Sequence, residues 1–211
     1  MALFITLEGI EGCGKSSQAK RIADHLTARG HEVVLTFEPG ATPVTAGIRK
    51  LLADPANVLD ATAELMLFLA DRAQHVATVV RPALKDGKIV VCDRYSDSTL
   101  AYQGYGRGHD LDTLIGLNGF AAHGLTPDLT LWIDCDIGLG LGRAKRRAAG
   151  PGDRFEAEPL SFHQRIRDGF AALAGRFPER FVRIDGDLAE EEVGSCCIAA
   201  VDATLAARRI H

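Results

Sequence analysis

Short runs of hydrophobic residues alternate along the chain with longer stretches in which hydrophobic residues recur at helical spacing. The short runs predict strands, and several are almost entirely apolar, which is typical of strands buried on both faces of a sheet. The predicted strands are Leu3–Leu7, Glu32–Phe37, Lys88–Cys92, Leu129–Ile133 and Phe181–Ile184. The longer stretches predict helices over Lys15–Arg29, Val44–Ala53, Ala61–Lys85, Leu111–His123, Ile137–Ala149, Pro159–Arg176 and Ala189–Arg208.

This alternation of strands and helices predicts an α/β fold. Strands joined by helical crossovers form a parallel sheet with right-handed connections, and the helices cover both of its faces. We therefore expect a three-layer α/β/α architecture around a five-stranded parallel sheet, in a single domain that spans residues 1–211. Ligands of such sheets bind at the carboxyl ends of the strands.

The composition narrows the classes of partner. The 24 basic and 28 acidic residues give a formal net charge of −4, so long-range attraction to nucleic acid or to an anionic membrane is not expected. Apolar stretches such as Leu65–Ala70 are far shorter than the roughly 20 residues of a membrane span, and the N-terminal segment lacks the basic start of a secretory signal. The five cysteines have no metal-ligand spacing and predict reduced thiols in a cytoplasmic protein.

A glycine-rich loop directly follows the first predicted strand. Residues 9–16 read GIEGCGKS and match the GxxxxGK[ST] phosphate-binding pattern in its strand-loop-helix setting. Backbone N–H groups of such a loop converge on phosphate oxygens, Lys15 reaches the β- and γ-phosphates, and the Ser16 hydroxyl is a ligand for Mg²⁺. A glycine-rich turn that only opens a helix is the alternative. The predicted nucleotide-binding residues are Gly9, Ile10, Glu11, Gly12, Cys13, Gly14, Lys15, Ser16 and Ser17.

Glu11 places a carboxylate inside a loop built for anions. At an effective dielectric constant near 20, a like charge about 6 Å away costs on the order of 3 kcal/mol before screening. This cost predicts that the Glu11 side chain points away from the phosphates, toward a donor on a second substrate such as a sugar hydroxyl. A solvated loop carboxylate is the alternative.

An acid and a base follow the third predicted strand. Asp93 is the candidate to hold Mg²⁺, directly or through water, and Arg94 is then expected to face the phosphates. An ordinary surface ion pair is the alternative. Arg49 and Arg72 lie in predicted helices nearby, and each is a weaker candidate to clamp the phosphate of an acceptor.

Residues 143–156 read RAKRRAAGPGDRFE, in which a basic helix end is followed by a Gly-Pro-Gly breaker. Phosphoryl transfer requires exclusion of water and neutralisation of charge on the γ-phosphate, so the segment is interpreted as a helical lid that delivers an arginine. Arg154, beyond the breaker, is the preferred candidate. For Lys145 and Arg146, interaction with the dipole of their own helix is an equal alternative.

Two other patterns predict no site. Gly138–Gly142 begins like a dinucleotide-binding fingerprint, but Arg143 occupies the third glycine position, which favours a helix that is merely rich in glycine. His75, His123 and His163 have no partners at metal-ligand spacing and are interpreted as core or surface residues.

Several separate motifs resemble those of bacterial thymidylate kinases over essentially the whole chain. They are the FITLEGIEGCGKSSQ start, Glu38-Pro39-Gly40, the IRKLL helix, LFLADRAQH at 67–75, DRYSDSTLAYQG at 93–104 and DRFE at 153–156. The resemblance implies that Glu11 meets the 3′-hydroxyl of thymidylate, that Arg49 and Arg94 contact its phosphate, and that Tyr102 crowds the ribose 2′ position. It also implies that the base contacts Phe68, Arg72, Ser98 and Gln103.

The activity that this resemblance implies is phosphorylation of dTMP to dTDP by ATP and Mg²⁺, in dTTP biosynthesis. The catalytic residues would be Lys15, Asp93, Arg94 and Arg154. The chain would form one kinase domain with a lid at about 143–156, and two copies would assemble as a homodimer. Ala41 departs from the family's EPGGT segment, which puts in doubt any role that needs positive φ there. Gly12 stands where eukaryotic members have an arginine, so the bacterial subtype with a lid arginine is expected.

Two other functions stay open on the residues alone. Another nucleoside monophosphate kinase or a deoxynucleoside kinase shares the phosphate loop, although a nucleoside kinase needs a base near a neutral hydroxyl. A GTPase-type switch is expected to contain an NKxD stretch, and the chain has none.

Overall fold

The sheet is parallel throughout and has five strands. The computed structural model describes residues 2–147 and 153–209. The strands are β1 (Leu3–Glu8), β2 (Val33–Phe37), β3 (Ile89–Asp93), β4 (Leu129–Asp134) and β5 (Phe181–Asp185). Their order is β2-β3-β1-β4-β5, and every neighbouring pair is parallel. The expected α/β class and five-stranded parallel sheet are confirmed.

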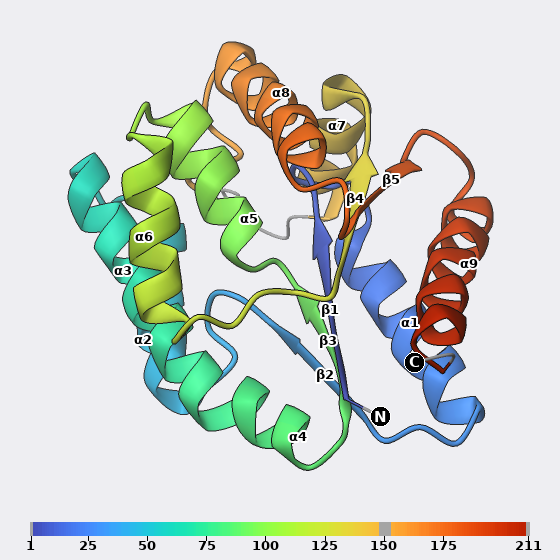
Figure 1. Ribbon diagram of the computed structural model, residues 1–211. Helices are drawn as coiled ribbons and strands as arrows, with labels where there is room; N and C mark the ends of the chain where they lie inside the picture. The colour runs from blue at the N-terminus through green and yellow to red at the C-terminus, as the bar shows by residue number, and fades with distance from the viewer. Residues whose placement is uncertain (1, 148–152, 210–211) are drawn as a thin grey trace.

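Helices cover both faces of the sheet (Figure 1). Helices α1 (Lys15–Ala28) and α9 (Glu190–Arg209) lie on one side, and α3 (Ala61–His75), α4 (Arg81–Lys85) and α6 (Leu111–Ala121) lie on the other. Helix α2 (Pro43–Ala53) packs on α3. Helices α7 (Ile137–Arg147) and α8 (Leu160–Arg176) lie at the end of the sheet toward which the strands point.

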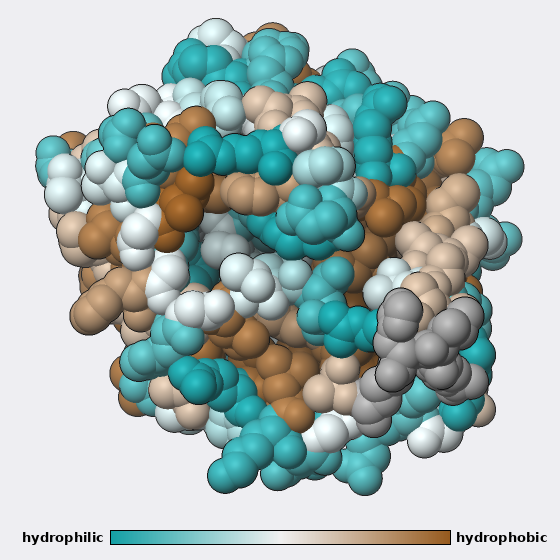
Figure 2. Space-filling model, viewed as in Figure 1, coloured by the Kyte–Doolittle hydropathy of each residue, from teal (hydrophilic) through white to brown (hydrophobic). Residues whose placement is uncertain are grey.

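On the face of the molecule that Figure 2 shows, hydrophilic residues cover much of the surface, with hydrophobic residues between them. Within the described part of the chain, no helix has the length and apolar character needed to cross a membrane.

Two helical regions differ from the prediction. The expected helix Ala61–Lys85 contains a π-helical segment, η1 (Val76–Val80), between α3 and α4. Pro82 follows this segment and has no N–H to bond to the preceding turn, which explains the local widening. A further helix, α5 (Ser96–Thr99) with η2 (Leu100–Gly106), was not predicted. Most of its residues are buried on all sides, so it has no amphipathic stripe.

Helix α7 packs directly on the loop that follows β1. A Cβ atom at Gly12 would lie 1.9 Å from the backbone carbonyl oxygen of Gly140, and one at Gly140 would lie 2.6 Å from that of Glu11. The interpretation of 138–142 as a helix merely rich in glycine is therefore incomplete, because Gly140 allows this close approach. Residues 148–149 of the predicted helix lie outside the described residues.

A buried carboxyl group supports the turn after β3. Glu8, the last residue of β1, accepts hydrogen bonds from the Tyr95 backbone N–H (2.8 Å) and the Ser98 hydroxyl (2.5 Å). Burial, together with the nearby charge of Asp97, raises the pKa of Glu8 to about 8. Glu8 is therefore largely protonated at neutral pH, and its two hydrogen bonds hold the turn that contains Arg94.

We expect Glu8→Gln to change the pH dependence of stability. Because the pKa of Glu8 is higher in the folded state than in the unfolded state, its contribution is complete below about pH 4.5 and is lost as the pH rises toward 8. The variant and the wild type should have similar free energies of unfolding at pH 5, and the variant should be more stable at pH 8.5, by on the order of 1 to 3 kcal/mol. Urea unfolding at both pH values measures this difference, and an equal difference at both would contradict the prediction.

Candidate active site

A cleft of about 710 Å³ opens at the carboxyl ends of the strands. It includes most of the residues predicted to form the site, namely Glu11, Gly12, Gly14, Lys15, Ser16, Arg49, Phe68, Arg72, Asp93, Arg94, Ser98, Tyr102 and Gln103. The predicted residues that do not line it are Gly9, Ile10, Cys13, Ser17 and Arg154. The structure thus brings together residues from four separate segments of the sequence.

The phosphate loop between β1 and α1 has the conformation that its glycines permit. Gly9, Gly12 and Gly14 all have positive φ angles, which residues with a Cβ atom rarely adopt. The Lys15 ammonium group lies over this loop and donates hydrogen bonds to the carbonyl oxygens of Gly9 (3.1 Å) and Ile10 (2.7 Å). A positive charge therefore lies at the loop, next to the start of α1.

A hydroxyl group and a carboxylate meet beside this loop. The Ser16 hydroxyl, in the first turn of α1, donates a hydrogen bond to the carboxylate of Asp93 at the end of β3. A hydroxyl and a carboxylate are hard donors of the kind that Mg²⁺ prefers. The described residues contain no group of three or more His, Cys, Asp or Glu side chains able to hold a metal. The two residues therefore suit Mg²⁺ that obtains its other ligands from nucleotide phosphates and water.

Arg94 joins the loop to the opposite wall of the cleft. Its backbone has a positive φ of 70°, an uncommon conformation for arginine, in the turn that Glu8 holds. Its guanidinium group donates to the Gly9 carbonyl oxygen (3.1 Å), to the Ser98 hydroxyl (3.2 Å) and to Oε1 of Glu11 (3.2 Å). Ser98 thus lies between Glu8 and Arg94 and fixes the position of the guanidinium group.

Glu11 faces this arginine. Its Oε1 also accepts a hydrogen bond from the Tyr102 hydroxyl (2.6 Å). Burial alone would raise the pKa of Glu11, but the adjacent His163 and the charges of Arg94 and Lys15 outweigh it and lower the pKa to about 2. Glu11 is therefore ionised at neutral pH and belongs to the Arg94 side of the cleft.

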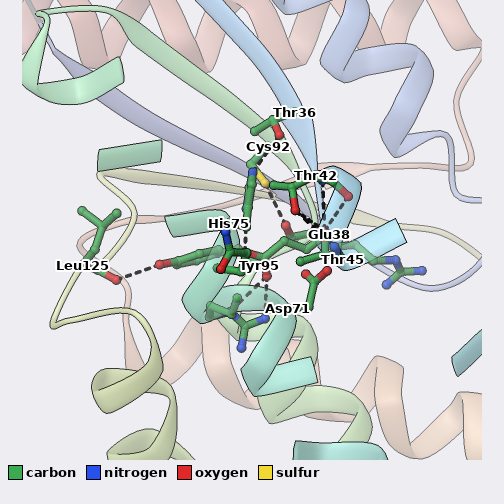
Figure 3. A network of polar contacts seen from close by, with 12 residues as sticks. Thr36, Glu38, Thr42, Thr45, Asp71, His75, Cys92, Tyr95 and Leu125 are labelled. Carbon is green, nitrogen blue, oxygen red and sulfur yellow. Dashed lines mark hydrogen bonds and ion pairs between the residues drawn. The ribbon is translucent and has the colours of Figure 1, made fainter. Parts of the chain in front are cut away.

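A buried network fixes Arg72. Its guanidinium group donates from Nε to Oε2 of Glu38 (3.0 Å) and from Nη1 to the Thr99 hydroxyl (2.9 Å), and its Nη2 forms an ion pair with the same Glu38 oxygen (2.9 Å). His75 bonds the other oxygen of Glu38 (2.8 Å) and the Thr36 hydroxyl (2.7 Å), as Figure 3 shows. The sequence motif named Glu38 but assigned it no role. The sequence did contain a signal for a structural role of Glu38, because an acidic residue at the buried end of a strand needs a partner.

The segment after Glu38 positions Arg49. The backbone N–H of Gly40 donates to Asp71 (2.7 Å), and Arg49 donates to the carbonyl oxygen of Pro39 (2.8 Å). Gly40 has a φ of 105°, whereas the only described non-glycine residues with positive φ are Arg94 and His123. Ala41 therefore needs no positive φ, and its substitution for glycine leaves this turn intact.

One end of the cleft is aromatic. The ring of Phe155 lies 6.0 Å from that of Phe68 and 5.8 Å from that of Tyr102, measured between centroids. All three side chains line the cleft. Phe155 had no predicted role, although it lies inside the DRFE motif.

Arg154 does not lie at the phosphate loop. Its guanidinium group forms an ion pair with Glu64 (2.7 Å) and donates to the carbonyl oxygen of Leu52 (3.1 Å). A buried carboxylate such as Glu64 requires compensating charge, and Arg107 provides more of it. The expected delivery of Arg154 to the phosphates is thus not seen in this conformation. Residues 148–152 of the expected lid lie outside the described residues.

The histidines agree with their interpretation. His75 and His163 are buried in the core around the cleft, and His123 is exposed.

Comparisons with known proteins agree with one family. The family model described as "Thymidylate kinase" matches residues 7–195. The thymidylate kinase of Geotalea uraniireducens (strain Rf4) is 48% identical over 211 residues, covering 98% of this chain and 99% of that protein. That of Trichlorobacter lovleyi is 50% identical over 209 residues, covering 97% and 99%.

A solved structure agrees as well. The crystal structure of thymidylate kinase from Ehrlichia chaffeensis has a TM-score of 0.79 and 35% identity, and the match covers 95% of this chain and 98% of that one. The sequence match and the shared fold both extend over almost the full length, so the chain belongs to the thymidylate kinase family.

Proposed function

We propose that the cleft transfers the γ-phosphoryl group of ATP in line to the 5′-phosphate of dTMP. The conversion of dTMP to dTDP is the activity of the family to which the chain belongs, and it leads to dTTP. The observation that carries the proposal is the position of Arg94. Its guanidinium group bonds the phosphate loop at Gly9 and, on the acceptor side, Glu11 and Ser98. It is therefore placed to contact the phosphates of both nucleotides.

The donor half is the phosphate loop, residues 9–17. Its backbone N–H groups bind the phosphates of ATP, and Lys15 neutralises charge on the transferred group. Ser16 and Asp93 would hold Mg²⁺, which would supply positive charge to the phosphates.

The acceptor half lies beyond Arg94. Arg49 and Arg94 bind the 5′-phosphate, which suits the bidentate geometry of guanidinium groups. Glu11 accepts a hydrogen bond from the 3′-hydroxyl, and the Tyr102 ring, held by its bond to Glu11, excludes a 2′-hydroxyl. Phe68 stacks on the base, whose edge meets Arg72 and Gln103.

No general base is required. The attacking oxygen belongs to a phosphate that is already ionised near neutral pH, so catalysis consists of positioning and electrostatic stabilisation. This distinguishes the site from that of a nucleoside kinase, because the guanidinium groups of Arg49 and Arg94 suit an acceptor that already carries a phosphate. Arg154 contributes positive charge to the transferred phosphoryl group after it leaves its ion pair with Glu64 and binds the phosphates. This is expected for the bacterial subtype with a lid over about 143–156.

The proposal extends to a cytoplasmic homodimer. The five cysteines are all free thiols. Met66 on α3 and Phe120 on α6 are 48% and 85% exposed, and the two helices pack together, which supports an apolar contact between copies. Sedimentation at micromolar concentration measures the oligomeric state, and a monomer there would contradict this part of the proposal.

Turnover of ATP with a panel of acceptors tests the reaction itself. We expect rapid ADP formation with dTMP, slower turnover with dUMP, and little with CMP or thymidine, because thymidine lacks the phosphate that the arginines bind. A coupled assay measures all four in parallel. Faster turnover with thymidine than with dTMP would contradict phosphate recognition and favour a nucleoside kinase.

We expect Arg154→Ala to lower kcat by about 100- to 1,000-fold, the usual effect of losing one preorganised charge donor. The KM for dTMP should change much less, because Arg154 is not among the residues that line the cleft. Arg165→Ala is the matched control, since Arg165 lies on α8 and, within the described part of the chain, donates only to the backbone carbonyls of Ser161 and Gly106. Near-wild-type kcat in Arg154→Ala would exclude the lid assignment.

We expect Tyr102→Ala to weaken discrimination against a ribose 2′-hydroxyl by roughly 10- to 100-fold, because it removes a steric block. Tyr102→Phe keeps the ring and loses only the hydroxyl that bonds Glu11, so it should retain the discrimination. The readout is the ratio of kcat/KM for dTMP and its ribose counterpart. An unchanged ratio in Tyr102→Ala would rule out the steric role.

A further inference from the structure

The side-chain amide of Gln103 is held by a buried carboxylate. Its Nε2 donates a 2.9 Å hydrogen bond to Oε1 of Glu64, and both residues are only 1% exposed. Gln103 lines the cleft on η2, whereas Glu64 approaches from the first turn of α3. Among the described residues, no side chain or backbone group donates to Oε1 of Gln103. The amide oxygen is thus the end available to a ligand.

Glu64 can bond the amide in only one orientation. Burial raises the pKa of Glu64, but the hydrogen bonds from Arg107, Gln103 and Arg154 outweigh it and lower the pKa. An ionised carboxylate accepts hydrogen bonds and donates none. The NH₂ end of Gln103 must therefore face Glu64, because the flipped amide would place two acceptors against each other inside the protein.

The fixed amide presents an acceptor to the base. Thymine has an N–H donor at N3, whereas cytosine has an unprotonated nitrogen acceptor there. A flipped amide would present its NH₂ group and suit cytosine instead. We propose that Glu64 is a positioning residue for base selectivity, which orients the Gln103 amide so that the cleft accepts pyrimidines with an N3–H. The inference rests on the base contact assigned to Gln103 in the proposed function.

The test compares dTMP with 5-methyl-dCMP, which keeps the methyl group and differs only at N3 and position 4. The readout is the ratio of their kcat/KM values, so effects that Glu64 variants have on Arg154 and on catalysis in general cancel. Glu64→Gln should reduce this preference for dTMP about tenfold, the size of one hydrogen bond, because glutamine both accepts and donates. The remaining preference reflects Arg72.

An exchange variant separates orientation from structural damage. In Glu64→Gln with Gln103→Glu, residue 64 donates to residue 103, which then offers only acceptors to the base. The net charge is unchanged, and we expect this double variant to regain most of the lost preference for dTMP. Glu158→Gln is the matched control, because Glu158 pairs with Arg107 (2.6 Å) but does not contact Gln103. Its ratio should equal that of the wild type.

Gln103→Leu separates failure of the inference from failure of the proposed base contact. If Gln103→Leu reduces the preference for dTMP and Glu64→Gln does not, Gln103 contacts the base but Glu64 does not orient it, and the inference is overturned. If Gln103→Leu leaves the preference unchanged, the base contact itself is wrong, and the inference fails with it. A fall in Glu64→Gln that the exchange variant does not reverse also overturns the inference, because it indicates loss of structure rather than of orientation.

Discussion

The ion pair between Glu11 and Arg94 lies where the two halves of the cleft meet, and the rest of the site is arranged around it. A carboxylate inside a phosphate-binding loop would repel the ligand if it stood alone. The Arg94 guanidinium group compensates the charge of Glu11 at a distance of 3.2 Å, and Lys15 adds a second positive charge nearby. Because the pair is partly buried, removal of either partner would leave an uncompensated charge, which costs about 3 to 5 kcal/mol in comparable pairs. The cleft therefore depends on both residues being present.

The position of Arg94 is in turn determined by the sheet. Glu8 ends the central strand β1, and Asp93 ends β3, which pairs with it. Glu8 bonds the Tyr95 N–H and the Ser98 hydroxyl, and this keeps Arg94 in a left-handed conformation that its side chain alone would disfavour. A protonated carboxyl group in the core thus supports a cation at the surface of the cleft.

Local chemistry was predictable from the sequence and long-range pairing was not. The phosphate loop is specified by glycines and a lysine within eight consecutive residues, so Lys15 and Ser16 could be assigned without knowledge of the fold. Strands such as Ile89–Asp93 were recognisable because burial on both faces leaves them apolar. The helix over Ser96–Gly106 was missed because its burial on all sides removes the periodicity on which helix prediction depends. The pairing of Arg154 with Glu64 joins residues 90 positions apart, and no local pattern encodes it.

Pairing with carboxylates also explains how arginine side chains remain buried in and around a cleft that binds anionic nucleotides. Glu38 holds Arg72, Glu64 holds Arg154, and Glu11 holds Arg94. Burying an unpaired guanidinium group is costly, so each arginine is already desolvated beside an acid before any ligand arrives. In the proposed reaction, a phosphate that takes a place beside Arg94 or Arg154 exchanges one acceptor for another. Binding then does not have to remove water from the cation, so its free energy can orient the reacting groups. Phosphoryl transfer requires such preoriented charges.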